Sequence, residues 1–271
     1  RFNNFYNFIE RYGGYRGTEP QNLDDLHQRT KDLIIRRLKK DVLKEFPDKQ
    51  RNDLFVEMTS EDIKEYNTHL TTLFKKWSQL GKPTVAEMPT IQKFLITKKM
   101  PRVIEMIDEY LESGRGILIF SIYIDPLKQL LKHYKTDAVM VYGKMNSTER
   151  QKSIDKLSSG EAKIGLFSLG AGSMGIDGIQ KQIDTVIFLD HWWVPAVHEQ
   201  AEDRVHRIGQ NNKVQIYYMI CENTIDEYMR EILLEKQKII DTVVDGKLVS
   251  IARDKSYFKE FVQKLNKSYI N

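Results

Sequence analysis

The sequence has few of the features that mark secreted, membrane-spanning or disordered chains. It has a single cysteine, Cys221, among 271 residues, so no disulfide can form within the chain. No apolar run approaches the ~18 residues that cross a bilayer, and the opening RFNNFYNFIERY lacks the basic-then-apolar pattern of a secretory signal. Hydrophobic residues make up 41% and charged residues 30%, as in folded globular domains. We therefore expect an intracellular folded chain without a membrane partner.

A phosphate-binding loop is also missing. The pattern Gly-x-x-x-x-Gly-Lys-Ser/Thr occurs nowhere. Three Gly-Lys pairs are present, and they are followed by Pro83, Met145 and Leu248. The Asp-Glu pairs at 108/109 and 226/227 lie in amphipathic helical sequence, so they are interpreted as surface acids. The histidines at 191, 198 and 206 are too irregularly spaced to predict a metal site, and none is expected.

The net charge of +4 is unevenly distributed along the chain. Between Arg29 and Arg51 there are nine basic residues against four acidic ones, and the remainder is nearly neutral. Such a block is typical of a solvated helix face. Alternatively, it follows the phosphates of a nucleic acid.

From residue 101 onward, helical patterns alternate with short apolar runs, which indicates a parallel sheet flanked by helices. The predicted strands are 116–120, 138–142, 162–167, 185–189 and 214–221. The predicted helices are 101–112, 125–134, 147–158, 195–208 and 224–243. The first ~110 residues read as helical and irregular, with an extended run at 52–58 and a helix from Thr59 to Leu80. The fold class is therefore α/β, with a helical N-terminal extension and a C-terminal brace helix.

A glycine-rich segment follows the strand predicted at 162–167. Gly170, Gly172 and Gly175 form Gly-x-Gly-x-x-Gly, and Asp190 ends the next strand, as in a dinucleotide-binding fingerprint. Only about ten residues separate Gly175 from that strand, which leaves little room for a crossover helix. Plain turn glycines and a backbone loop that contacts phosphate or DNA are the alternatives.

The stretch QAEDRVHRIGQ at 200–210 is the most informative in the chain. On a helix, Gln200, Arg204 and Arg207 would share one edge, while a second stripe could pack on the sheet. That second stripe is Ala201, Val205 and Ile208. Two guanidinium groups on one edge suit the phosphates of a nucleotide. The alternative is a solvated helix with the i to i+4 pairs Asp203 with Arg207 and Glu202 with His206.

Taken together and in order, these segments resemble the C-terminal RecA-like lobe of the Swi/Snf-type ATP-dependent DNA translocases, within the second helicase superfamily. The segments that carry the resemblance are LIIRRLKKDVLKEFPDK at 33–49, GILIFSIYIDPLKQLL at 116–131, VYGKMNSTERQKSIDKL at 141–157, SLGAGSMGID at 168–177, TVIFLDHWWVPAVHEQ at 185–200, QAEDRVHRIGQ at 200–210 and the following VQIYYMICENTIDEYM. The resemblance covers about residues 1–243. It divides the chain into four parts: 1–58, the tail of a first ATPase lobe and linker; 59–100, a helical linker or protrusion; 101–223, the RecA-like lobe; and 224–271, a brace helix and tail.

The resemblance implies roles for individual residues. Arg204 and Arg207 would act as arginine fingers on ATP, with Gln200, Gly175 and Asp177 beside the nucleotide. The residues expected to grip the DNA backbone are Ser121, Gly143, Lys144, Ser168, Gly170 and Gly172. The chain departs from the family pattern at Leu169, Gly170, Ser173, Asp177 and Val194, which puts individual DNA contacts in question. Trp192 and Trp193 are interpreted as packing against the arginine helix, with base stacking as the alternative.

The resemblance also implies partners. ATP and Mg²⁺ would be held mainly by the first RecA-like lobe of the same parent chain, and double-stranded or forked DNA would be the substrate track. Because this chain lacks the phosphate loop, it is expected to be inactive alone. The location would be the nucleus in a eukaryote and the cytoplasm or nucleoid otherwise. A DNA-binding or partner-docking module without ATP chemistry and a dinucleotide-dependent oxidoreductase are the other hypotheses.

Overall fold

The structure, a computed structural model, describes residues 4–13, 20–34, 39, 46–80, 88–170 and 176–245. The chain divides into two compact units, one of Arg1–Lys44 with Arg230–Asn271 and the other of Glu45–Met229. The four-part division expected from the resemblance stays a prediction. In the part of the chain that is described, no helix has both the length and the apolarity to span a membrane.

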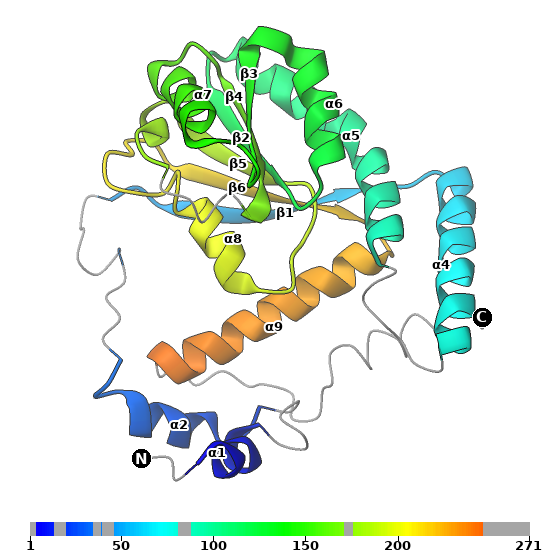
Figure 1. The fold of residues 1–271 in the computed structure, drawn as a ribbon, viewed down its shortest axis with the longest axis vertical. Coiled ribbons are helices and arrows are strands. Elements are labelled where there is room, and N and C mark those ends of the chain that lie inside the picture. The colour runs from blue at the N-terminus through cyan, green and yellow to red at the C-terminus, as the bar shows by residue number, and fades with distance from the viewer. Residues whose placement is uncertain are drawn as a thin grey trace. The chain divides into compact units, whose positions relative to one another are not determined.

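The larger unit is built on a six-stranded sheet in which every pair of neighbouring strands is parallel (Figure 1). The strand order is β1-β6-β5-β2-β4-β3. The strands are β1 (Lys49–Val56), β2 (Gly116–Ser121), β3 (Ala138–Val141), β4 (Ile164–Ser168), β5 (Ile183–Phe188) and β6 (Val214–Cys221). All carboxyl ends therefore lie at one edge of the sheet, where open α/β sheets bind their ligands.

Five of the strands were predicted, and the prediction of a five-stranded sheet is wrong by one strand. The sixth strand is β1, which overlaps the extended run predicted at 52–58 but was not assigned to the sheet. It pairs with β6 from Lys49 beside Val214 to Val56 beside Cys221. Its sequence KQRNDLFV is largely polar, so it gives no apolar run. It is nevertheless a strand because its backbone completes the ladder at the edge of the sheet, where polar side chains can reach water.

Helices cover both faces of this sheet. Successive residues of β2 alternate between two apolar clusters, with Leu118 and Phe120 in one and Ile117 and Ile119 in the other. The first cluster is closed by α7 (Ser147–Ser159) and α8 (Pro195–Glu202), and the second by α5 (Met88–Glu112) and α6 (Ile124–Tyr134). Burial on both faces explains why the central strands are continuous apolar runs.

Several helix boundaries differ from those predicted. Helix α5 begins at Met88 rather than 101 and keeps Pro101 inside it, and α4 spans Ser60–Leu80. The N-cap of α7 is Asn146, whose side chain accepts from the Glu149 N–H at 2.8 Å. Pro195 opens α8 as expected, but α8 ends at Glu202, six residues before the predicted end at 208.

The smaller unit contains the helices α1 (Phe5–Tyr12) and α2 (Leu23–Thr30) and most of α9 (Ile225–Asp245). Asp25 accepts hydrogen bonds from Arg11 at 2.9 Å and from the Tyr12 hydroxyl at 2.5 Å, which joins α1 to α2. The His27 ring lies 2.8 Å from the Val243 carbonyl of α9. Residues 35–38 and 40–45 of the basic block, and the tail after 245, fall outside the described residues.

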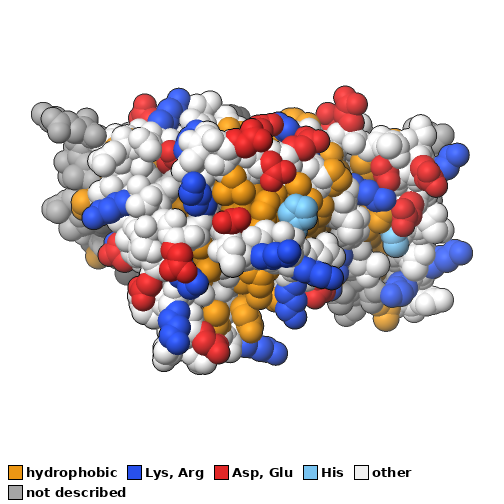
Figure 2. Space-filling model, turned by 90° about the horizontal axis from the view of Figure 1, so that it is seen from above, with side chains coloured by type: hydrophobic (Ala, Val, Ile, Leu, Met, Phe, Trp, Pro, Cys, Tyr) orange, Lys and Arg blue, Asp and Glu red, His pale blue; other side chains and the backbone are white. Residues whose placement is uncertain are grey.

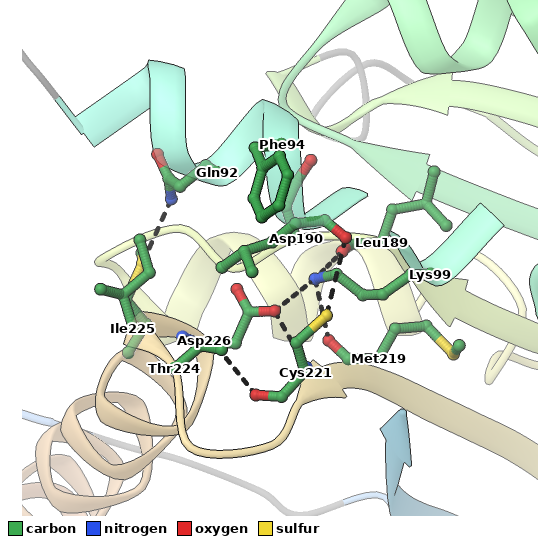
Figure 3. A network of polar contacts seen from close by, with 12 residues as sticks. Gln92, Phe94, Lys99, Leu189, Asp190, Met219, Cys221, Thr224, Ile225 and Asp226 are labelled. Carbon is green, nitrogen blue, oxygen red and sulfur yellow. Dashed lines mark hydrogen bonds and ion pairs between the residues drawn. The ribbon is translucent and has the colours of Figure 1, made fainter. Parts of the chain in front are cut away.

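A buried ammonium group ties α5 to the sheet (Figure 3). Lys99 is fully buried, and its Nζ donates to the carbonyl of Leu189 at 2.6 Å and that of Met219 at 3.3 Å. Its counter-ion is Asp226, 2.7 Å away, which also accepts from the backbone N–H of Cys221. Asp226 is buried, so its interpretation as a surface acid is wrong. The sequence could not show this, because the partner of Asp226 is a lysine more than a hundred residues upstream.

We expect Lys99→Met to lower the free energy of unfolding by about 3–5 kcal/mol, because Asp226 would then be a buried charge without its counter-ion. The neighbouring Lys98 provides a matched control. Its pair with Asp62 is 2.7 Å long, but the two side chains are 25% and 21% exposed. Lys98→Met should cost no more than about 1 kcal/mol. Urea unfolding of both variants measures the difference, and equal losses would contradict the role given to Lys99.

Candidate functional site

The loops at the carboxyl edge of the sheet enclose a hollow of about 730 Å³. Four of the residues predicted to grip DNA line it together: Gly143, Lys144, Ser168 and Gly170. They come from the loop after β3 and from the end of β4, which are neighbouring strands. Tertiary structure thus brings together residues that lie more than twenty positions apart in the sequence. Trp192 also lines the hollow and is 41% exposed.

Ser121, the fifth described member of that predicted set, does not line the hollow. It is fully buried at the end of β2, and its hydroxyl donates to Asp190 Oδ2 at 2.5 Å. Asp190 also accepts from the Ile122 N–H at 2.9 Å. Burial raises the pKa of Asp190 to about 6, and these two hydrogen bonds oppose that rise. Ser121 therefore fixes the loop after β2 that places Ile122 and Ile124 in the wall of the hollow.

The glycine-rich segment is only partly visible. Gly172 and Gly175 lie outside the described residues, and the described chain resumes at Ile176. Between there and β5 stands a single 3₁₀ turn, Ile179–Lys181. A dinucleotide fold needs a crossover helix after its glycines, so this connection does not support the oxidoreductase hypothesis.

Residues 203–210, which we call the arginine segment, form a series of turns rather than the predicted helix. Val205 is buried, but Ile208 is 76% exposed, so the predicted stripe of Ala201, Val205 and Ile208 does not exist. Gly209 ends the segment with φ of +94°, a conformation that suits glycine. Gln200 lies exposed on α8, while Arg204 and Arg207 belong to the turns.

The arginine segment nevertheless lies beside Asp177, which was also predicted to face the nucleotide. Arg207 Nη1 donates to the Ile176 carbonyl at 3.0 Å and lies 3.4 Å from Asp177 Oδ1. The Gly178 N–H and the side chain of Gln180 also donate to Asp177, and with the charge of Arg207 they lower its pKa. The Arg207 side chain remains 35% exposed. A fixed cation therefore faces outward beside a carboxylate.

Gln180 is a site residue that sequence analysis missed. Its side chain is 94% buried and donates both to Asp177 Oδ1 at 3.3 Å and to the Ile208 carbonyl at 3.2 Å. It therefore joins the loop that carries Asp177 to the end of the arginine segment. Nothing in the local sequence distinguishes Gln180 from the exposed polar residues that follow it.

Glu202 is the second missed residue. Its carboxylate is fully buried and accepts hydrogen bonds from Arg51 at 2.8 and 2.7 Å and from the Tyr218 hydroxyl at 2.7 Å. Lys49 Nζ lies 2.7 Å away. Burial alone would raise the pKa of Glu202, but the bonds and charges of Arg51 and Lys49 outweigh burial and lower it to about 2.

The alternative of a solvated helix with i to i+4 pairs is therefore wrong. Glu202 pairs with Lys49 and Arg51 of β1, and the His206 ring lies 2.8 Å from the Pro47 carbonyl. Asp203 lies 3.4 Å from Lys49. The partners come from about 150 residues upstream, a distance at which helical spacing carries no information.

The arrangement offers cations rather than a metal site. Within the described ranges, no group of three or more His, Cys, Asp or Glu side chains could hold a metal ion. Lysine and arginine side chains are interspersed with acidic ones on the face seen in Figure 2, rather than gathered in one basic patch. The exposed cations that the predicted site residues offer to an anion include Arg207 and Lys144.

Comparison with known proteins gives two matching family models. The SNF2-related domain matches residues 2–108, and the helicase conserved C-terminal domain matches residues 98–209. An uncharacterised ATP-dependent helicase of Mycoplasma genitalium is 30% identical over 88% of this chain and 24% of its own length. The human DNA annealing helicase and endonuclease ZRANB3 is 28% identical over 91% of this chain and 25% of its own length. The chain thus spans about a quarter of these relatives.

Among solved structures, the SWI2/SNF2 ATPase core domain of Sulfolobus solfataricus aligns with a TM-score of 0.62 at 23% identity, covering 98% of this chain and 58% of its own. The same core in complex with double-stranded DNA aligns with a TM-score of 0.58 at 22% identity, covering 90% and 57%. At these identities the likeness establishes the fold, a RecA-like α/β sheet.

The depressed pKa of Glu202 predicts how stability depends on pH. A carboxylate whose folded pKa lies below its unfolded value of 4.5 stabilises the fold above that pH, and the stabilisation is lost as pH falls toward about 2. At about 1.4 kcal/mol per pKa unit, Glu202 would contribute roughly 3 kcal/mol at neutral pH. We expect Glu202→Gln to be less stable at pH 7 and to have a flatter stability curve between pH 5 and 2.

Glu199→Gln is the control for that experiment. Glu199 lies on the same helix, 3.7 Å from Arg51, but is 33% exposed. Its replacement should leave the curve nearly unchanged. Urea unfolding at a series of pH values measures all three proteins, and parallel curves for Glu202→Gln and the unchanged chain would show that Glu202 does not titrate as inferred.

Proposed function

The chain belongs to the Swi/Snf-type, SNF2-related family of ATP-dependent helicases, and on that premise we propose that it is the second motor lobe of a double-stranded DNA translocase. In this proposal the lobe supplies arginine fingers to ATP held mainly by a first RecA-like lobe of the same parent chain, and grips the DNA backbone. The relatives named as DNA annealing helicases support a fork-remodelling or strand-annealing type. The parent would act in the nucleus of a eukaryote, or in the cytoplasm or nucleoid otherwise.

The observation that carries the nucleotide role is the fixed but open Arg207. The arginine segment is held by Glu202 at its start, by Gln180 at its end and by the bond from Arg207 itself to Ile176. The guanidinium remains 35% exposed. A cation that needs no reorganisation stabilises developing phosphoryl charge more effectively than a mobile one. Arg204, in the same segment, and Gln200, on α8, would lie beside it.

The chain contributes only part of the catalytic machinery in this proposal. When bound, Mg²⁺ neutralises phosphate charge, and in this proposal the first lobe would hold the ion, as the family resemblance implies. This chain's residues would orient the terminal phosphate and place positive charge beside it. Alone, the chain is expected to be inactive.

The hollow supports the DNA role. Lys144 lines the hollow and is exposed, and Gly170 lines the same hollow. At Gly143 no heavy atom beyond its chain neighbours lies within 4 Å of the place where a Cβ would stand. The backbone at such an open glycine can approach a phosphate closely. Contacts of this kind position a duplex without reading its sequence. Gly172 and Ser168 stay in the proposed DNA set, while Ser121 would act through the loop that it fixes.

In the full-length protein, we expect Arg207→Ala to lower DNA-stimulated ATP hydrolysis by at least ~10²-fold, given the magnitudes known for arginine fingers. DNA affinity should change little, because the guanidinium acts on the nucleotide. Arg207→Lys should restore little activity, since an ammonium lacks the planar fork. Steady-state ATPase rates and DNA affinities are measured on the same preparations.

Lys132→Ala is the control, because Lys132 is an exposed cation in the last turn of α6. Its turnover should stay within about twofold of the unchanged protein, as for a remote surface charge. A folded Arg207→Ala protein with normal turnover and weakened DNA binding would show that the arginine segment binds DNA rather than acting on the nucleotide. That result would favour the module without ATP chemistry.

For the DNA side, Lys144→Ala in the full-length protein should weaken binding equally for unrelated duplex sequences. The slope of log affinity against log salt should fall by about one, as for the loss of a single phosphate contact. Lys163→Ala, at the opposite edge of the sheet before β4, should leave the slope unchanged. Fluorescence anisotropy over a salt series makes the measurement. An unchanged slope for Lys144→Ala would contradict the proposal that DNA phosphates bind at the hollow.

A further inference from the structure

The partners of Glu202 lie on an edge strand. Lys49 and Arg51 belong to β1, whose only neighbour within the described sheet is β6. Tyr218, the third partner, belongs to β6. An edge strand is bonded on one side only, so it is the strand most easily displaced from a sheet. The counter-charges of a fully buried carboxylate are thus carried by an edge strand.

Residues 47–51 contact residues 202–206 at several points. Arg51 and Lys49 bind Glu202, and Lys49 lies 3.4 Å from Asp203. One turn further, the His206 ring lies 2.8 Å from the Pro47 carbonyl. Together the contacts join the start of β1, and the residue two positions before it, to the end of α8 and the first half of the arginine segment. The segment therefore depends on β1 for its position as well as on the helix that precedes it.

Glu202 also sets the backbone that follows it. Its carbonyl accepts from the N–H of Val205 at 3.1 Å and from that of His206 at 2.9 Å. The side chain of Glu202 is thus held by β1, while its carbonyl holds the turn that leads directly into Arg207. A shift of the carboxylate would be transmitted over five residues to the guanidinium.

We propose that Glu202 is a positioning residue that couples edge strand β1 to the arginine segment, so that the seating of β1 controls where Arg207 points. The inference rests on the function proposed for Arg207. A buried carboxylate is costly unless it is paired, so releasing Arg51 and Lys49 would drive Glu202 out of its place. The ionic cluster thus makes β1 and the arginine segment move together. Displacement of β1 would therefore move the Arg207 guanidinium away from the nucleotide.

The test uses the full-length protein with Glu202→Gln, Arg51→Ala and the double variant. We expect turnover to fall by about 10- to 100-fold in each single variant, the loss that a misplaced catalytic group produces, while the KM for ATP changes by less than about threefold. The double variant should be no slower than the slower single variant, because both changes break the same coupling.

Hydrogen–deuterium exchange gives a readout apart from activity. Backbone amides of residues 203–210 should exchange faster in Glu202→Gln and Arg51→Ala, whereas those of β2 should be unchanged. Arg115→Ala is the matched control: Arg115 makes a similar two-bond pair with Asp184, at 2.6 and 3.3 Å, and does not contact the arginine segment. Its turnover and its exchange at 203–210 should equal those of the unchanged protein.

The outcomes separate the two proposals. Normal turnover in Arg207→Ala would overturn the proposed function and this inference together. Loss of turnover in Arg207→Ala with normal turnover and exchange in Glu202→Gln would overturn this inference alone. Additive losses in the double variant would also contradict the coupling. If Glu202→Gln fails to fold, Arg51→Ala decides the question, because Arg51 is 38% exposed, and its unchanged turnover would reject the coupling.

Discussion

A single buried lysine holds the carboxyl edge of the sheet, where the hollow lies. The ammonium of Lys99 binds backbone carbonyls at the ends of two neighbouring strands and pairs with Asp226 at the start of α9. The carbonyl of Leu189 directly precedes Asp190, which in turn fixes the loop after β2 through Ser121. An ion pair in such surroundings is specific because an unpaired charge there is strongly disfavoured. The loops that border the hollow therefore start from a rigid base.

The arginine segment shows a different way to place a functional side chain. A helix would fix Arg207 through local hydrogen bonds, but α8 ends at Glu202. The following turns are held instead by groups from elsewhere: β1, Gln180 and the carbonyl of Ile176. This design keeps the guanidinium partly open to solvent while its backbone is held at both ends. It suits a group that must meet a partner carried by another part of the protein.

The proposed nucleotide and DNA roles lie at opposite edges of the sheet. The hollow gathers loops after β2, β3, β4 and β5, at the carboxyl edge. The arginine segment leads into the start of β6, and it contacts Ile176 and Gln180, which precede β5, and Pro47, which precedes β1. These contacts place the arginine segment at the amino edge, so the strands themselves connect the two sites.

The sequence by itself determined the class of fold, the five apolar strands and the family motifs. Central strands buried on both faces appear in the sequence as continuous apolar runs. The family motifs can be recognised from the identity and order of their residues alone. Only the tertiary structure decided that the polar run 49–56 belongs to the sheet, that Asp226 is buried and that α8 ends at Glu202. Each of these depends on partners roughly 130 to 165 residues away along the chain. Local periodicity reports which face of an element is buried, whereas the free energy of a buried charge depends on groups that only folding brings within bonding distance.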